Sequence, residues 1–156
     1  MIKERIAVFA GSFDPVTIGH KAIVIKALSL FDRVIVLLGE NSSKKTLFSL
    51  EQRKKWLEQT FEIQDNVSVC SYKGLTVDFC KQNNVNFIVR GVRNEADFQY
   101  EKNIAAINKE IAPDIETIFL LTDKDFEVVS SSFVREMILH KKDVSRYLPK
   151  GVEIEN

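Results

Sequence analysis

The sequence predicts one α/β domain with a five-stranded, doubly wound parallel sheet. Short apolar runs alternate with longer amphipathic stretches along the whole chain, which is the pattern of strands and helices in turn. The apolar runs recur roughly every thirty residues, as in successive βαβ units with right-handed crossovers. The length of 156 residues is typical of one domain, and no repeat or linker interrupts it. We therefore expect a single domain over residues 1–156.

Five apolar runs are the expected strands. Those at 6–10 and 34–38 are apolar at every position, and that at 117–121 is apolar at every position after Thr117, as in strands that are covered on both faces. Glycines follow the first two of these runs directly, at Gly11 and Gly39. In chain order, the expected strands are residues 6–10, 34–38, 67–70, 87–89 and 117–121.

Amphipathic stretches between these runs are the expected helices. Ser49 and Gln52 have the spacing of a capping box and predict the start of the second helix. Pro113 stops the fourth helix. In chain order, the helices are expected at residues 20–31, 50–60, 76–83, 97–111 and 131–140, with a further turn at 145–148.

Composition narrows the class of protein. The chain has 22 Lys plus Arg and 22 Asp plus Glu, so it has no overall field that would attract nucleic acid or an anionic membrane. Cys70 and Cys80 lack the spacing of a disulfide framework or a zinc site and are expected to be buried thiols. No apolar run approaches the ~20 residues of a membrane span, and no secretory signal is visible. We expect a cytoplasmic protein.

A doubly wound sheet binds ligands beyond the carboxyl ends of its strands, where the strand order reverses. Four segments lie there, at residues 11–20, 39–45, 90–93 and 122–132. In the first, Gly11 and Asp14-Pro15 form a turn, Gly19 permits close approach of a ligand, and His20 lies near a helix start. For any single one of these residues a plain loop with a surface histidine is the favoured explanation, but the whole string favours a phosphate site.

Two further segments carry cations. Lys44 and Lys45 are either solvated or supply a mobile cation to a phosphate. Arg90 directly follows an apolar strand, where its guanidinium can bind phosphate in a bidentate manner. The alternative is an ion pair between Arg90 and Asp97 or Glu101 at the surface.

The fourth segment contains three serines at a helix start, residues 130–132. They form either a simple N-cap or a set of hydroxyl and N–H donors for a triphosphate. Arg135, one turn into the helix, either reaches that phosphate or lies at the surface.

These strings together resemble a known superfamily. The chain resembles the nucleotidyltransferases with a T/H-x-G-H signature in three places. These are residues 11–20 (GSFDPVTIGH), the Arg-Gly-x-Arg block with Asp-Phe-x-Tyr-Glu after it, and the Val-Ser-Ser-Ser string. No G-x-G-x-x-G dinucleotide fingerprint follows the first strand. The signature here begins with Thr17 and ends with His20. With threonine at the first position it is similar to the signature of the phosphopantetheine adenylyltransferase family. That resemblance implies a Rossmann-like fold.

The resemblance also implies roles for particular residues. His20 would stabilise the transition state with the help of Lys44 and Arg93, while Arg90 would hold the acceptor phosphate. The implied acceptor-binding residues are Ser12, Lys44, Thr76, Arg90 and Asn108. For Asn108 a packing role is an equal alternative. The implied ATP-binding residues are Ser12, Phe13, His20, Gly91, Val92, Arg93, Glu101, Phe126, Val129, Ser130, Ser131 and Ser132.

The implied reaction is transfer of the adenylyl group of ATP to 4'-phosphopantetheine, giving dephospho-coenzyme A and pyrophosphate. It would proceed by direct in-line attack, as the penultimate step of coenzyme A biosynthesis. The resemblance further implies Mg²⁺ as cofactor with no protein metal site, feedback inhibition by coenzyme A, and a homohexamer. The alternatives are a related nucleotidyltransferase acting on nicotinamide mononucleotide or on a sugar or glycerol phosphate, and a nucleotide-binding module without turnover.

Overall fold

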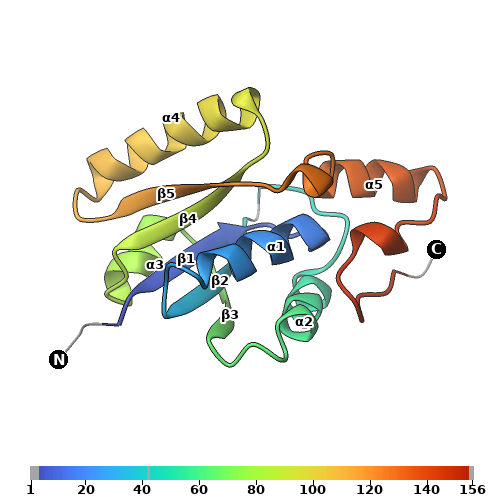
Figure 1. The fold of residues 1–156 in the computed structure, drawn as a ribbon, viewed down its shortest axis with the longest axis horizontal. Coiled ribbons are helices and arrows are strands. Elements are labelled where there is room, and N and C mark those ends of the chain that lie inside the picture. Colours follow the sequence, from blue (N-terminus) through green and yellow to red (C-terminus); the bar gives the residue numbers. More distant parts are fainter. Residues whose placement is uncertain (1–3, 42, 155–156) are drawn as a thin grey trace.

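Five parallel strands form the centre of the molecule (Figure 1). The computed structural model describes residues 4–41 and 43–154, so residues 1–3, 42, 155 and 156 of the expected domain lie outside the described residues. The strand order is β3-β2-β1-β4-β5. The strands are β1 (Ile6–Gly11), β2 (Arg33–Gly39), β3 (Val67–Tyr72), β4 (Phe87–Val92) and β5 (Glu116–Leu121). The predicted five-stranded, doubly wound α/β fold is confirmed.

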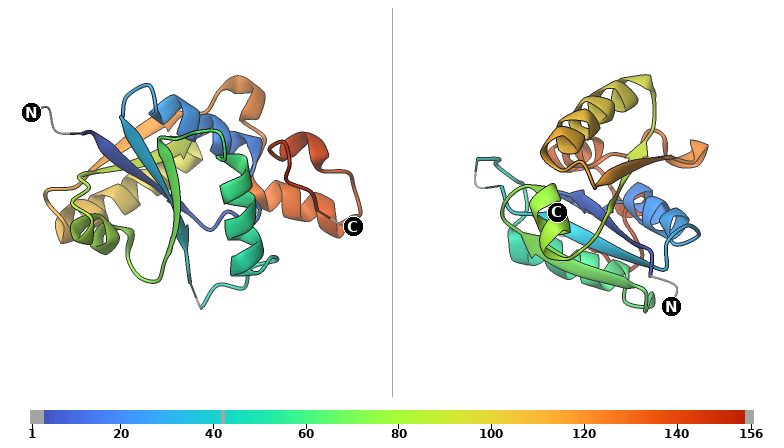
Figure 2. Two further views of the ribbon diagram at one scale, coloured as in Figure 1. Left: turned by 90° about the horizontal axis from the view of Figure 1, so that it is seen from below. Right: turned by 90° about the vertical axis from the view of Figure 1, so that its left-hand side faces the viewer.

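Helices connect the strands and cover both faces of the sheet (Figure 2). They are α1 (Ile18–Ala27), α2 (Leu50–Thr60), α3 (Thr76–Gln82), α4 (Glu95–Ile111) and α5 (Ser131–Leu139), with 3-10 turns η1 (Lys124–Phe126) and η2 (Ser145–Tyr147). Ser49 caps α2 by accepting a hydrogen bond from the backbone of Gln52, as its spacing predicts.

Two apolar clusters hold these layers together. One joins alternate residues of β1, β2 and β4 to α1, α2, α5 and the C-terminal segment, and the other joins the opposite alternation to α3 and the end of α4. Val36 and Leu37, neighbours on β2, are both buried but belong to different clusters. Successive strand side chains point to opposite faces, which explains why β2 is apolar at every position.

Several element boundaries differ from the predictions, and two of them differ by three residues or more. Helix α1 ends at Ala27, and the apolar periodicity continues to 31 because Phe31, in the turn after it, is itself buried. Strand β4 continues through Val92, since Arg90 and Gly91 pair with Phe119 and Leu120 of β5. The charged Arg90 therefore lies within the strand and not after it.

The chain leaves β1 at the point where the order of the sheet reverses, because β2 and β4 flank β1 on opposite sides. The loop after β1 thus opens onto the crevice where such sheets bind ligands. Within residues 4–41 and 43–154, no helix is both long and apolar enough to span a bilayer.

Candidate active site

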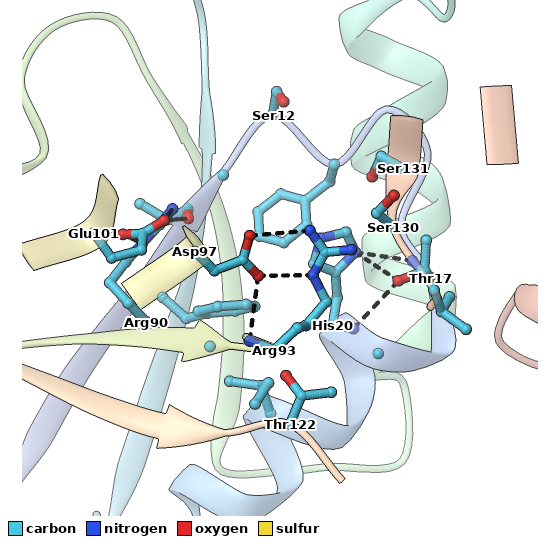
Figure 3. Close-up of a pocket in the computed structure, with 18 of the residues that line it drawn as sticks. Ser12, Thr17, His20, Arg90, Arg93, Asp97, Glu101, Thr122, Ser130 and Ser131 are labelled. Carbon is cyan, nitrogen blue, oxygen red and sulfur yellow. Dashed lines mark hydrogen bonds and ion pairs between the residues drawn. The ribbon is translucent and has the colours of Figure 1, made fainter. Parts of the chain in front are cut away.

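A cavity of about 330 Å³ opens at the carboxyl ends of β1 and β4 (Figure 3). The loop after β1, the first turn of α1, the start of α4, and the first residues of α5 surround it. Segments that are distant in sequence thus converge at the reversal point, as expected. The predicted site residues that line the cavity are Ser12, Phe13, His20, Arg90, Gly91, Arg93, Glu101, Val129, Ser130 and Ser131.

An unusual loop conformation shapes the floor of the cavity. Phe13 has a positive φ of 43° and is only 2% exposed; this backbone region is strained for a side chain of its size. Its ring packs edge-on against Phe9 and His20, with centroids 5.6 and 5.0 Å away. A Cβ atom on Gly11 would lie 3.2 Å from that ring, so a side chain there would require the ring to shift by a few tenths of an ångström.

His20 is oriented by a capping box at the start of α1. Its Nδ1 accepts the backbone N–H of Thr17 at 3.0 Å, and the Thr17 hydroxyl oxygen accepts the backbone N–H of His20 at 3.3 Å. Because Nδ1 is an acceptor, the proton of the neutral ring resides on Nε2. Burial, followed by the charges of Arg90 and Arg93, lowers the pKa of His20 to about 4. At pH 7 the imidazole is therefore a neutral hydrogen-bond donor.

Arg90 is held within the cavity wall by a carboxylate. Its Nε and Nη2 donate to the two oxygens of Glu101, each at 2.7 Å, and its Nη1 donates to the backbone oxygen of Ala10. The carboxylate of Glu101 is only 10% exposed. The predicted alternative of an ion pair is thus observed, but inside the cavity and not at the surface.

Arg93 has a matching carboxylate partner one helical turn away. Its Nε and Nη2 donate to Asp97 at 2.8 and 3.2 Å, and the backbone N–H of Arg93 donates to the same carboxylate at 3.2 Å (Figure 3). Asn94 caps α4 by accepting the backbone N–H of Asp97. The start of α4 thereby fixes the position of Arg93.

The three serines at the start of α5 make different hydrogen bonds. Ser130 is the N-cap and accepts the backbone N–H of Phe133, while Ser131 donates to the backbone oxygen of Pro15 at 2.7 Å. Ser132 is exposed and contacts the guanidinium of Arg135. Arg135 also donates to the backbone oxygen of Asp14 at 2.7 Å. Arg135 therefore contacts the loop after β1. Neither of its two predicted roles, binding of phosphate or a position at the surface, includes this contact.

Six predicted ligand-binding residues are absent from the cavity wall: Lys44, Thr76, Val92, Asn108, Phe126 and Ser132. Lys44 is exposed in the loop after β2; its neighbour Ser42 is outside the described residues. Thr76 begins α3, Asn108 lies in α4, and Phe126 lines a separate, mostly apolar groove beside α1. Their ligand contacts stay predictions.

Gly91, an expected ATP contact, also has a role in packing. A Cβ atom there would lie 2.9 Å from Cγ1 of Ile23. Its missing side chain therefore makes room for α1 against the sheet, although Gly91 also lines the cavity.

Several cavity residues had no assigned ligand-binding role, although Gly19 was expected to permit close approach of a ligand. They are Phe9, Ala10, Gly11, Thr17, Gly19, Ile23, Asp97, Tyr100 and Thr122. For Asp97 the signal was its place four residues after Arg93 at a helix start, which favours an ion pair. Thr122 directly follows β5, and its place at a strand end was a signal of the same kind as for Arg90.

Comparisons with known proteins agree with this geometry. A bifunctional NMN adenylyltransferase/ADP ribose pyrophosphatase from Francisella tularensis has the same fold, with a TM-score of 0.70 and 21% identity over 94% of this chain and 45% of that one. The profile of the cytidylyltransferase-like family matches residues 8–137.

Relatives that match almost end to end share one name. Phosphopantetheine adenylyltransferases from Flavobacterium psychrophilum and Bacteroides thetaiotaomicron are 47% and 43% identical, covering 97% and 96% of this chain and 99% of each relative. A third, from Porphyromonas gingivalis, is 42% identical over 99% of this chain and the whole relative. This chain is thus a nucleotidyltransferase of the cytidylyltransferase-like family and belongs to its phosphopantetheine adenylyltransferases.

Proposed function

We propose that this protein transfers the adenylyl group of ATP to 4'-phosphopantetheine, giving dephospho-coenzyme A and pyrophosphate. One observation carries the proposal: His20, Arg90 and Arg93 converge on a single cavity with the capped start of α5. Such a set of donors suits two phosphate-bearing reactants that repel each other. The names of the full-length relatives support the choice of acceptor.

The reaction needs no group to activate the nucleophile, because the acceptor phosphate is already ionised. The cavity residues fit this. Neither Cys70 nor Cys80 lines the cavity, and the Nδ1 of His20 is occupied by Thr17. We therefore propose direct in-line attack without a covalent intermediate.

Each donor has a separate part in this scheme. Arg93 and the first turn of α5 bind the triphosphate of ATP, and Arg90 with Lys44 binds the acceptor phosphate. His20 donates from Nε2 to the phosphate under attack. As a neutral donor it stabilises the negative charge that develops there without a change in its own protonation. Glu101 acts through Arg90, which its carboxylate holds.

Mg²⁺ is the divalent ion that we expect with ATP. In the described part of the chain, no three His, Cys, Asp or Glu side chains gather into a metal cage. The cavity carboxylates, Asp97 and Glu101, are engaged by arginines. This donor set suits an ion held mainly by phosphate oxygens and water, as Mg²⁺ commonly is. When bound, it would share the negative charge of the triphosphate.

The decisive experiment is incubation of the protein with ATP, Mg²⁺ and 4'-phosphopantetheine. We expect pyrophosphate and a product that is heavier than the acceptor by one AMP moiety, detected by mass spectrometry. Nicotinamide mononucleotide, a sugar phosphate and glycerol phosphate, each with ATP and with CTP, are the matched alternatives. Turnover with one of these and none with phosphopantetheine would refute the assigned acceptor.

The same proposal makes this reaction the penultimate step of coenzyme A biosynthesis in the cytoplasm, with coenzyme A as a feedback inhibitor. A homohexamer also stays a prediction. In its support, α4 exposes four large apolar side chains, Phe98, Tyr100, Ile107 and Ile111. Light scattering after size-exclusion chromatography measures the assembly, and titration of coenzyme A into the assay measures inhibition.

A further inference from the structure

We propose that Asp14 is a positioning residue for the acceptor: it fixes the segment after Lys44 to the loop that carries Ser12. The inference rests on the proposed function, because Lys44 and Ser12 are the expected acceptor contacts. Asp14 does not line the cavity, so it acts through the two segments that it joins.

The side chain of Asp14 is buried and fully engaged with backbone. The residue is 3% exposed; its Oδ2 accepts the backbone N–H of Leu47 and its Oδ1 that of Phe48, each at 2.9 Å. Arg135 lies 3.8 Å from Oδ2 and donates to the backbone oxygen of Asp14. A buried carboxylate with two backbone donors and a nearby cation is strongly held. Asp14 thus ties together three parts of the chain.

Arg53 on α2 joins the same two segments independently. It is 5% exposed; its Nη1 donates to the backbone oxygen of Ser12 at 2.7 Å, and its Nε donates to that of Phe48 at 3.1 Å. Burial lowers the pKa of Arg53, and the charge of Asp14 opposes that effect. Two buried charged side chains therefore hold residues 47–48 against residues 12–14.

The consequence concerns the reach of Lys44. It lies three residues before Leu47, so the Cα of Lys44 stays within about 10 Å of that fixed point. The backbone oxygen of Ser12 accepts a hydrogen bond from Arg53, and Ser12 lines the cavity. The anchor thereby limits the positions that Lys44 can take relative to Ser12 before the acceptor arrives, which lowers the cost of ordering them.

The test is Asp14→Asn, which preserves shape but places an amide NH₂ against one backbone N–H. We expect the KM for phosphopantetheine to rise about 10- to 100-fold, as for an unsatisfied buried donor. The KM for ATP should rise much less than the KM for phosphopantetheine, because the contacts of Arg93 and His20 are unaffected. Arg53→Lys, which loses the fork to Ser12 and Phe48, should shift the same constant in the same direction, and it serves if Asp14→Asn does not fold.

The matched control is Asp32→Asn. The carboxylate of Asp32 also accepts a backbone N–H, that of Arg5 at 2.7 Å, but at the amino edge of the sheet. We expect both KM values of this variant to match those of the wild type. Equal rises for ATP and acceptor in Asp14→Asn, or an unchanged acceptor KM, would overturn the inference.

Hydrogen exchange separates this inference from the proposed function. In Asp14→Asn the amides of Leu47 and Phe48 should exchange faster, while those of β1 keep their protection. Continued protection of both amides would refute the anchor whatever the activity. Conversely, if the wild type makes no dephospho-coenzyme A while the two amides lose protection in the variant, the proposed function fails and the anchor stands.

Discussion

Lowering the pH from 7.5 to 5 should destabilise the fold through His20. Its pKa is about 4 in the folded protein, against an ordinary value of 6.5. Between these two values the unfolded chain binds a proton that the folded chain does not, so stability falls as the pH falls through this range. At pH 7.5 the ring is almost unprotonated in both states, and the effect nearly vanishes.

The size of the effect follows from the two pKa values. At pH 5 the ring is almost fully protonated in the unfolded chain and about one-tenth protonated in the folded one, which corresponds to about 2 kcal/mol of lost stability. His20 is half-buried, and solvent screening makes this figure an upper limit.

The assay is urea unfolding of the wild type and of His20→Gln at pH 5 and pH 7.5. Other titrating groups, His140 included, are common to both proteins, so their contributions cancel in the difference. We expect the wild type to lose up to about 2 kcal/mol more than the variant between the two pH values. Parallel losses in the two proteins would refute the burial and charge argument for His20.

Four other changes test the remaining features. His20→Ala should lower kcat about 10²- to 10³-fold with little change in ATP binding; wild-type turnover in steady-state kinetics would contradict its role. Arg90→Ala should weaken phosphopantetheine binding about 10- to 100-fold by calorimetry, and unaltered affinity would count against it. Gly91→Ala, with its methyl 2.9 Å from Ile23, should cost about 1–3 kcal/mol in urea unfolding, and the same change should cost less when it is made in an Ile23→Ala background. Burial raises the pKa of Cys80 to about 11, so an alkylating reagent at pH 8 should modify Cys80 only after unfolding. Rapid labelling of Cys80 in the folded protein, located by peptide mass spectrometry, would contradict this.

The fold could be predicted because its signals are local. Residues 34–38 are apolar at every position and both of their faces are covered, so periodicity and length were enough to identify β2. The end of α1 was wrong because Phe31 continues the apolar period from within a turn. A buried loop residue and a buried helix residue are both apolar, so the sequence pattern alone does not distinguish them.

The site was most predictable in the segments between a strand end and the next helix. His20 lies in the first turn of the helix after β1, Arg90 near the carboxyl end of β4 and Arg93 directly after β4, and the topology of the sheet brings these together. The bonds of Asp14 to the backbone of Leu47 and Phe48 cross 33 and 34 residues, and no local pattern encodes such a contact. The capping box at Thr17 also lacks the usual sequence pattern, because a histidine takes the place of the usual glutamate or glutamine.

The two arginine–carboxylate pairs also affect which anions the empty cleft attracts. Arg90 with Glu101 and Arg93 with Asp97 sum to no net charge, so a lone inorganic phosphate or sulfate gains little by entering and must compete with a carboxylate already in place. A ligand that presents several phosphoryl oxygens to both guanidinium groups at once gains far more. The cleft can thereby remain free of the abundant small anions of a cell and stay available to larger phosphate esters.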